Sequence, residues 1–131
     1  MLFKDRAEWR KVDAVLERSE FIDQMVAAQL SPEERGRAVV YLREGSYAKG
    51  DEISFPGIVQ QAPWDAWLAF VDQDPTANWG HRSRYLLVDE VTGESLSFDA
   101  RFPPFRRDQA QGWRICYRAG GVPDAALLIP P

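Results

Sequence analysis

The sequence predicts an α+β domain in which two or three N-terminal helices pack on one face of an antiparallel sheet of four to six strands, connected as a meander. Three observations support this class. Apolar residues recur at spacings of three and four within residues 1–45, which is typical of helices. Glycine and proline punctuate residues 46–63, which excludes a long helix there. Apolar or alternating runs of strand length then fill much of residues 64–119.

Size and composition fit one domain. The chain has 131 residues, of which 45% are hydrophobic and 27% are charged. These values indicate a single globular domain over residues 1–131, with a helical part at 1–45 and a mainly β part at 46–131. One cysteine cannot form an internal disulfide. No apolar run approaches the roughly 18 residues of a membrane-spanning helix, so we expect a cytoplasmic protein that does not enter a membrane.

The clearest helix signal begins at Ser31. Ser31 suits the N-cap, Pro32 the first helical position, and Glu34 completes a capping box. We expect this helix to end at Gly45 and to turn three apolar residues inward: Ala38, Val39 and Leu42. Residues 5–29 fit either one helix or two, and a second capping box begins at residue 5.

The strands are expected in order along the rest of the chain. Residues 53–55 and 58–59 are candidate short strands close to Pro56. In residues 64–71 and 84–89, apolar side chains occur at both odd and even positions. This pattern is typical of strands that are covered on both faces. Residues 90–94 form a turn in which Gly93 can adopt positive φ.

Two alternating segments follow. Residues 95–102 and 113–119 alternate between apolar and polar side chains, which predicts half-buried strands. Residues 125–129 could add a last short strand. The hairpin of residues 87–96 resembles those of small helix-plus-meander domains such as the PepSY-type and cystatin-like groups. Its motif is turn chemistry, so we carry over no site residues.

Charge is distributed unevenly. Residues 1–45 carry eight basic and nine acidic side chains (−1), residues 46–100 carry three and nine (−6), and residues 101–131 carry five and two (+3), which sum to the net charge of −4. This balance argues against binding to nucleic acid, which needs a surplus of Lys and Arg. An acidic middle beside a basic tail can pair within the fold or present surfaces of opposite sign to a partner.

Residues 72–84 form a long connection that is rich in functional side chains, including the only histidine. Long loops on a rigid scaffold often carry function. The candidate binding residues are Asp72, Asp74, Asn78, Trp79, His81, Arg82 and Arg84. Trp79 is the proposed anchor for a partner, although a tryptophan in a loop can also cover the edge of a sheet.

Catalytic and metal sites are weakly indicated. His81 could act as a base towards Cys116. Because side chains alternate along a strand, we expect Arg114 and Arg118 on the same face as Cys116, where they would favour a thiolate. A buried, inert Cys116 is the favoured interpretation, because most free cysteines are buried. The acids of the loop do not match a calcium-binding pattern, and a single histidine is insufficient for a transition-metal site. We expect no metal and no cofactor.

The sequence therefore favours a non-catalytic protein-binding module. Its concrete form would be a cytoplasmic inhibitor or immunity-type protein that meets another protein through the acidic middle and the loop of residues 72–84. The alternatives are a small thiol-dependent enzyme that uses Cys116 with His81, and a small-ligand-binding domain.

Overall fold

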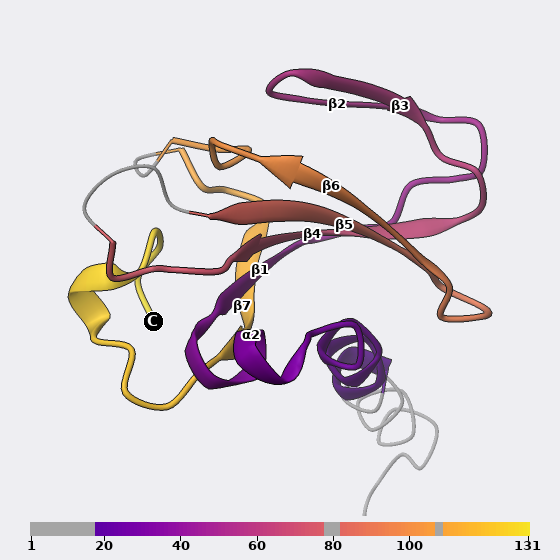
Figure 1. The fold of residues 1–131 in the computed structure, drawn as a ribbon. Coiled ribbons are helices and arrows are strands. Elements are labelled where there is room, and N and C mark those ends of the chain that lie inside the picture. The colour runs from indigo at the N-terminus through magenta and orange to yellow at the C-terminus, as the bar shows by residue number, and fades with distance from the viewer. Residues whose placement is uncertain (1–17, 78–81, 107–108) are drawn as a thin grey trace, which may run out of the picture.

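A computed structural model of the chain describes residues 18–77, 82–106 and 109–131, which form a mixed helix and sheet structure (Figure 1). A helix covers residues 18–27 and leads into the short helix α2. The elements that follow are α2 (Pro32–Arg37), β1 (Val39–Arg43), β2 (Glu52–Phe55), β3 (Ile58–Gln61), β4 (Ala66–Asp72), β5 (Ser83–Asp89), β6 (Ser95–Ala100), β7 (Trp113–Arg118) and the 3-10 helix η1 (Asp124–Ala126).

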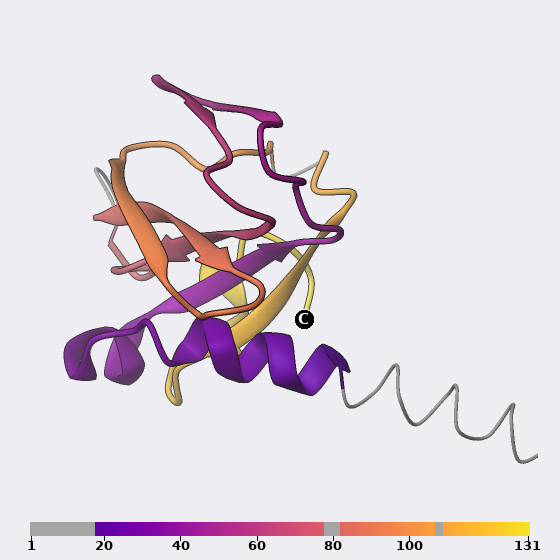
Figure 2. The ribbon, with the colours of Figure 1, turned by 90° about the vertical axis from the view of Figure 1, so that its right-hand side faces the viewer.

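The main sheet has five antiparallel strands in the order β6-β5-β4-β1-β7. Strands β4, β5 and β6 are consecutive neighbours and form the expected meander. Strand β1 lies between β4 and β7, so the sheet as a whole is not a simple meander. Strands β2 and β3 form a separate two-stranded sheet, which projects beyond the main sheet (Figures 1 and 2).

The expected helix from Pro32 to Gly45 is wrong beyond Arg37. Ala38 has extended backbone angles (φ −81°, ψ 157°), and the chain continues as β1. Val39 and Tyr41 pack on one face of the sheet, and Val40 and Leu42 pack on the other. β-branched valines favour strands, and residues 39–42 are buried at every position because both faces are covered. The helical part therefore ends at Arg37 rather than near residue 45.

Two hydrophobic cores lie on opposite faces of the main sheet. The helix side contains Ile22, Val26 and Leu30 against residues of β1, β4 and β5. The other side contains residues of the β2–β3 hairpin and of the C-terminal segment after β7. All seven residues of β4 are buried, as the apolar run had predicted. Trp67 belongs to the helix-side core and Trp64 packs against the other core, so these two rings occupy opposite sides of the sheet.

The C-terminal segment is not a strand. Asp124–Ala126 form a 3-10 helix, and Leu127 and Ile129 are buried in the core opposite the helices. The backbone N–H of Leu128 donates to the hydroxyl of Tyr41 at 2.9 Å. Prolines at positions 123, 130 and 131 lack the N–H that a strand would need. Within the described residues no helix is long and apolar enough to cross a membrane.

Candidate functional site

The site is built around the capping box of α2. The Ser31 hydroxyl accepts the Glu34 N–H at 3.1 Å, and the Ser31 N–H donates to Glu34 Oε1 at 2.9 Å. This reciprocal pair confirms the predicted N-terminus of α2. It also aims the Glu34 carboxylate towards the sheet, because the side chain must fold back over the first turn to reach Ser31.

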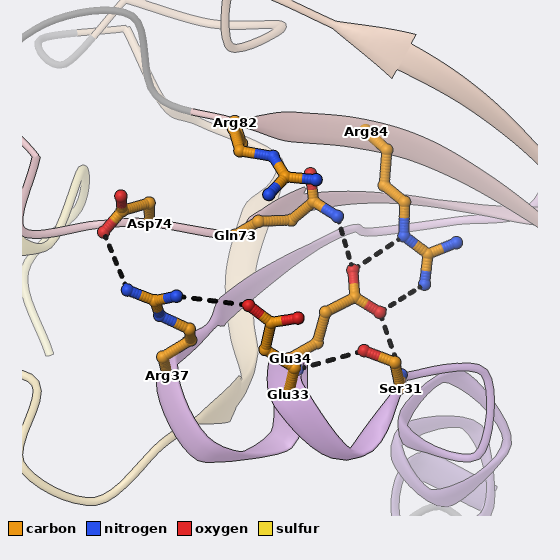
Figure 3. A pocket seen from close by; sticks show the side chains of 8 residues that line it. All are labelled: Ser31, Glu33, Glu34, Arg37, Gln73, Asp74, Arg82 and Arg84. Carbon is orange, nitrogen blue, oxygen red and sulfur yellow. Dashed lines mark hydrogen bonds and ion pairs between the residues drawn. The ribbon is translucent and has the colours of Figure 1, made fainter.

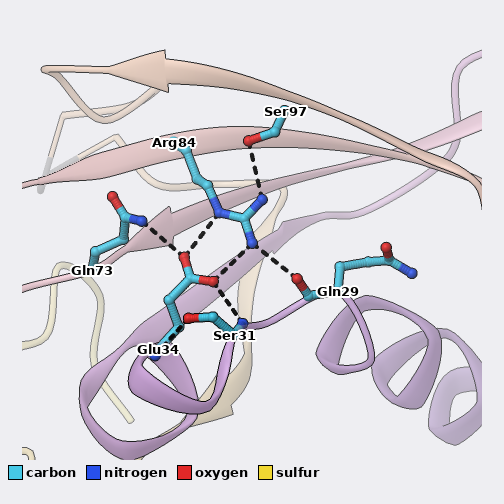
Figure 4. A network of polar contacts seen from close by, with 6 residues as sticks. All are labelled: Gln29, Ser31, Glu34, Gln73, Arg84 and Ser97. Atoms are coloured by element: carbon cyan, nitrogen blue, oxygen red, sulfur yellow. Dashed lines mark hydrogen bonds and ion pairs between the residues drawn. The ribbon is translucent and has the colours of Figure 1, made fainter.

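Glu34 and Arg84 form a two-contact ion pair between α2 and β5 (Figure 4). Arg84 Nε donates to Glu34 Oε2 and Arg84 Nη2 to Glu34 Oε1, both at 2.9 Å. Only 14% of the Arg84 side chain and 9% of the Glu34 side chain are exposed. The planar guanidinium matches the two carboxylate oxygens, which makes such paired hydrogen bonds strong and directional.

Further hydrogen bonds tie this ion pair to neighbouring elements. Arg84 Nη1 donates to Ser97 Oγ in β6 at 3.0 Å, and Arg84 Nη2 donates to the carbonyl of Gln29 at 3.1 Å. Gln73 Nε2, just after β4, donates to Glu34 Oε2 at 2.9 Å. Burial raises the pKa of Glu34, but hydrogen bonds from Arg84, Ser31 and Gln73 outweigh that effect, so its pKa lies below the ordinary value.

A polar pocket of about 330 Å³ opens beside this network (Figure 3). Its lining residues are Ser31, Glu33, Glu34, Arg37, Gln73, Asp74, Arg82 and Arg84. They include three acids and three arginines, so the pocket carries no net charge. At its rim Arg37 contacts Glu33 at 3.3 Å and Asp74 at 3.8 Å.

Arg82 differs from the other two arginines of the pocket. Arg84 is held by Glu34, and Arg37 lies between Glu33 and Asp74. The Arg82 side chain is exposed, and among the described residues it has no hydrogen-bond or ion-pair partner. Figure 3 shows its guanidinium at the pocket beside Gln73. The pocket therefore offers one cation with unused donors, which suits a carboxylate or another anionic group.

The start of the loop at residues 72–84 is held in a defined shape. The Gln73 N–H donates to the Arg82 carbonyl at 2.8 Å, which closes the base of the loop. Asp72 is only 1% exposed, and its carboxylate accepts the Asp74 N–H at 3.2 Å. This contact is an Asx-type turn, which fixes the chain as it leaves β4.

The seven candidate binding residues thus occupy different environments. Asp74, Arg82 and Arg84 line the pocket. Asp72 is buried, and Arg84 is engaged in the ion pair with Glu34, so these two side chains stabilise the scaffold. Asn78, Trp79 and His81 lie outside the described residues.

Sequence reasoning missed Glu33, Glu34, Arg37 and Gln73 as members of this site. Glu34 was recognised only as the end of a capping box. Its contact with Arg84 spans 50 positions of the sequence, and no local pattern indicates it. The signal that could have drawn attention to Arg84 is a lone arginine at the start of an otherwise apolar strand, because such a charge needs a partner.

Cys116 lies in an unreactive environment. It packs against the helix-side core, and burial, together with nearby Asp23, raises the pKa of its thiol to about 12 despite Arg114. Arg114 is held by Asp23 at 2.6 Å. A thiol with this pKa is almost entirely protonated near neutral pH, which disfavours nucleophilic chemistry.

A register shift between Val40 and Tyr41 separates the two arginines that flank Cys116. Arg114 pairs with Leu42 of the helix-side core, whereas Arg118 pairs with Val39 of the other core. Paired residues on neighbouring strands share a face, so the expectation that both arginines lie on the face of Cys116 is wrong. Arg118 instead contacts Asp124 at 2.7 Å.

The acids of residues 46–100 do not form one uniform surface. Asp72 and Asp89 are buried. Asp51 and Asp65 accept backbone N–H groups of Ala48 and Lys49. In the part of the chain that the structure describes, no group of three or more His, Cys, Asp or Glu side chains is arranged to hold a metal ion.

No family model, no curated protein and no solved structure matches this chain.

Proposed function

We propose that this protein is a non-catalytic protein-binding module whose contact surface is the pocket between α2 and the base of the loop at residues 72–84. One observation carries the proposal: Arg82 is an exposed guanidinium at a well-supported pocket, without a partner among the described residues. Arginine is enriched among the residues that dominate protein interfaces, because its fork binds carboxylates through two hydrogen bonds.

The surroundings of Arg82 favour recognition over chemistry. The backbone carbonyl of Arg82 accepts a hydrogen bond from the Gln73 N–H, and the Gln73 side chain donates a hydrogen bond to Glu34 of α2. The backbone at Arg82 is therefore already ordered, so binding of a partner would have to order only the side chain, which costs about 0.5–1.5 kcal/mol. The arginines Arg37 and Arg84 are already neutralised by acids of the same pocket, so Arg82 would select a single carboxylate of the partner.

The specific form that we propose is a cytoplasmic inhibitor or immunity-type protein. The net charge of −4 favours fast association with a partner of opposite overall charge. Arg82 would then recognise an acidic side chain within the otherwise basic contact surface of the partner. The partly buried Cys116, with its raised pKa, disfavours the thiol-dependent enzyme that the sequence left open.

A small-ligand-binding domain is the second candidate. The pocket volume of about 330 Å³ lies at the lower end of ligand pockets, which span roughly 300–1,000 Å³. A small carboxylate could satisfy Arg82 in the same way as a partner's side chain would. Native mass spectrometry of the purified protein would reveal such a ligand as a defined mass increment that is absent from an Arg82→Glu variant.

The protein-binding proposal is tested by affinity capture from source cells at low salt with three versions of the chain. Arg82→Glu reverses the charge at the pocket, and Arg106→Glu makes the same change at an exposed arginine outside it. We expect wild type and Arg106→Glu to capture the same partner and Arg82→Glu to lose it. With the purified partner, Kd should rise at least about tenfold, which is about 1.4 kcal/mol.

Thermal melts provide the control for folding. Surface substitutions of this kind usually change stability by less than about 0.5 kcal/mol, so all three versions should unfold at similar temperatures. Capture that is unaffected by Arg82→Glu, or the absence of any captured partner, would contradict the proposal.

A further inference from the structure

Strand β6 is an edge of the main sheet. Among the strands of the described residues its one neighbour is β5, with which it pairs in continuous register over all six residues (Figure 1). The opposite edge strand, β7, contains two arginines and lies next to the register shift in β1. Natural proteins protect edge strands with bulges, prolines, lysines or charges that discourage pairing. β6 has only one charged residue, Asp99, and lacks the other features.

The outward backbone groups of β6 belong to its odd-numbered residues. At the turn into β6 the Asp89 N–H donates to the Glu94 carbonyl at 2.7 Å. Hydrogen-bonded pairs alternate along an antiparallel ladder, so positions 96, 98 and 100 bond to β5. The N–H and C=O groups of Ser95, Ser97 and Asp99 therefore point away from the sheet.

Exposed apolar side chains are concentrated along the same edge. Of the five large hydrophobic residues that are exposed within residues 18–77, 82–106 and 109–131, three lie within residues 91–102. Their exposed fractions are 81% for Val91, 39% for Leu96 and 63% for Phe102. Val91 lies in the turn before β6 and Phe102 lies just after its end, so apolar surface flanks the unpaired backbone at both ends of the strand.

We propose that β6 pairs antiparallel with β6 of a second copy of this chain, about a two-fold axis at Ser97. Ser97 then lies opposite Ser97 of the second copy, and Ser95 lies opposite Asp99. All three residues with outward backbone groups exchange hydrogen bonds across the axis. Between these hydrogen-bonded pairs, Leu96 of each copy lies opposite Phe98 of the other in the closely spaced, non-hydrogen-bonded pairs. These pairs contribute apolar contacts between the two strands.

This register is favoured over its neighbours on two grounds. If the two β6 strands were shifted by one residue, backbone groups already bonded to β5 would lie opposite the free backbone groups of the second copy. The shift would also place side chains from opposite faces of the sheet next to each other. A shift by two residues that places Asp99 opposite Ser97 of the second copy would bring the two Asp99 side chains to within about 7 Å along the strand. The equal shift in the other direction would place Asp99 opposite Gly93, beyond the end of β6, so that one hydrogen-bonded pairing is lost. In the proposed register they lie about 14 Å apart along the strand, beyond the Debye length of about 8 Å at physiological salt.

The ends of the strand are also complementary to a second copy. Phe102 is five positions after Ser97, and Val91 is six positions before it. The two-fold axis therefore brings Phe102 of one copy close to the turn that carries Val91 of the other. Two exposed apolar side chains that have little cover in one chain can then contact each other.

Sedimentation of the full chain over a concentration series tests this pairing. A single-strand contact buries less than the about 1,200 Å² of a standard interface, so the dimer should dissociate on dilution. We expect Leu96→Lys and Asp99→Pro each to weaken self-association at least tenfold. Asp99→Pro removes an outward N–H that the ladder with β5 does not use, and Asp99 has no described side-chain partner.

Val59→Lys is the control for adding a positive charge at an exposed apolar residue outside β6. Val59 is 69% exposed on β3, in the separate two-stranded sheet, so this variant should self-associate as wild type does. Should Asp99→Pro fail to fold, as judged by its thermal melt, Leu96→Lys still decides the question.

Cross-linking tests the register. Residues of a hydrogen-bonded pair have Cα atoms about 5.5 Å apart, a separation that a disulfide can span. Under copper phenanthroline oxidation Ser97→Cys should form a covalent dimer, whereas Ser95→Cys should not. The wild-type Cys116 controls for background. A chain that stays monomeric up to millimolar concentration, a dimer unaffected by Leu96→Lys, or preferential cross-linking at position 95 would overturn the proposal.

Discussion

The ion pair between Glu34 and Arg84 should be a major contributor to stability. Arg84→Met keeps an apolar stem of similar length and removes the guanidinium. Glu34 accepts four hydrogen bonds through its carboxylate, two of them from Arg84. The variant would leave a nearly buried carboxylate with only Ser31 and Gln73 as donors. Breaking a buried ion pair costs about 3–5 kcal/mol, and the two remaining donors place our expectation near 3 kcal/mol.

Urea unfolding followed by tryptophan fluorescence measures this effect, because the chain has five tryptophans. The midpoint should fall while the slope stays unchanged. Arg37→Met is the matched control, since the Arg37–Glu33 pair is 53% and 72% exposed. Exposed pairs contribute roughly 0–1 kcal/mol, so the control should lose less than about 1 kcal/mol.

A double-mutant cycle isolates the pairwise term. Glu34→Gln removes the charge and keeps a residue that supports the capping box. The double variant Glu34→Gln with Arg84→Met has no buried charge at this site. Its free energy of unfolding should therefore be about 2 kcal/mol higher than the sum of the two single losses predicts. Equal losses for Arg84→Met and Arg37→Met, or strict additivity in the cycle, would refute this reasoning.

Two further predictions concern titratable groups. The folded pKa of Glu34 is depressed, so its contribution to stability is fully present above the ordinary carboxyl value of 4.5 and is lost as pH falls through the folded value. The urea concentration at the unfolding midpoint should therefore decrease as the pH is lowered below about 4.5. The Glu34→Gln variant should show a shallower decrease with pH. Identical pH profiles for the variant and the wild type would argue against this role of Glu34. Because burial raises the pKa of Cys116 to about 12, iodoacetamide at pH 8 should alkylate the thiol slowly in the folded chain and rapidly in urea. Rapid alkylation of the folded protein, abolished by His81→Ala, would restore the thiol enzyme.

Local signals in the sequence correctly placed most of the elements. The capping box at Ser31 and the turn with Gly93 at φ 77° depend on residues within a few positions of each other. The alternation of residues 113–118 and the fully apolar run of β4 also predicted strands. Such patterns survive in the structure because the contacts that produce them are close in sequence.

Val39–Arg43 shows where local reading failed. A continuation of the α2 helix and a central strand both fit an apolar run of this length. The choice depended on β4 and β7, which pair with β1 from distant parts of the chain. The contribution of Glu34 to the pocket was missed for a related reason, since Glu34 meets Arg84 only after α2 has packed beside β5.

The sequence by itself determined an α+β domain with an antiparallel sheet and a charged loop after residue 72, because periodicity and turn chemistry are local properties. Tertiary structure alone decided which charges are neutralised inside the fold and which remain at the surface. Arg82 and Arg84 are two positions apart and look alike in the sequence, yet one is exposed at a pocket and the other is buried against Glu34. That difference arises from the packing of α2 against the sheet, which no short segment encodes.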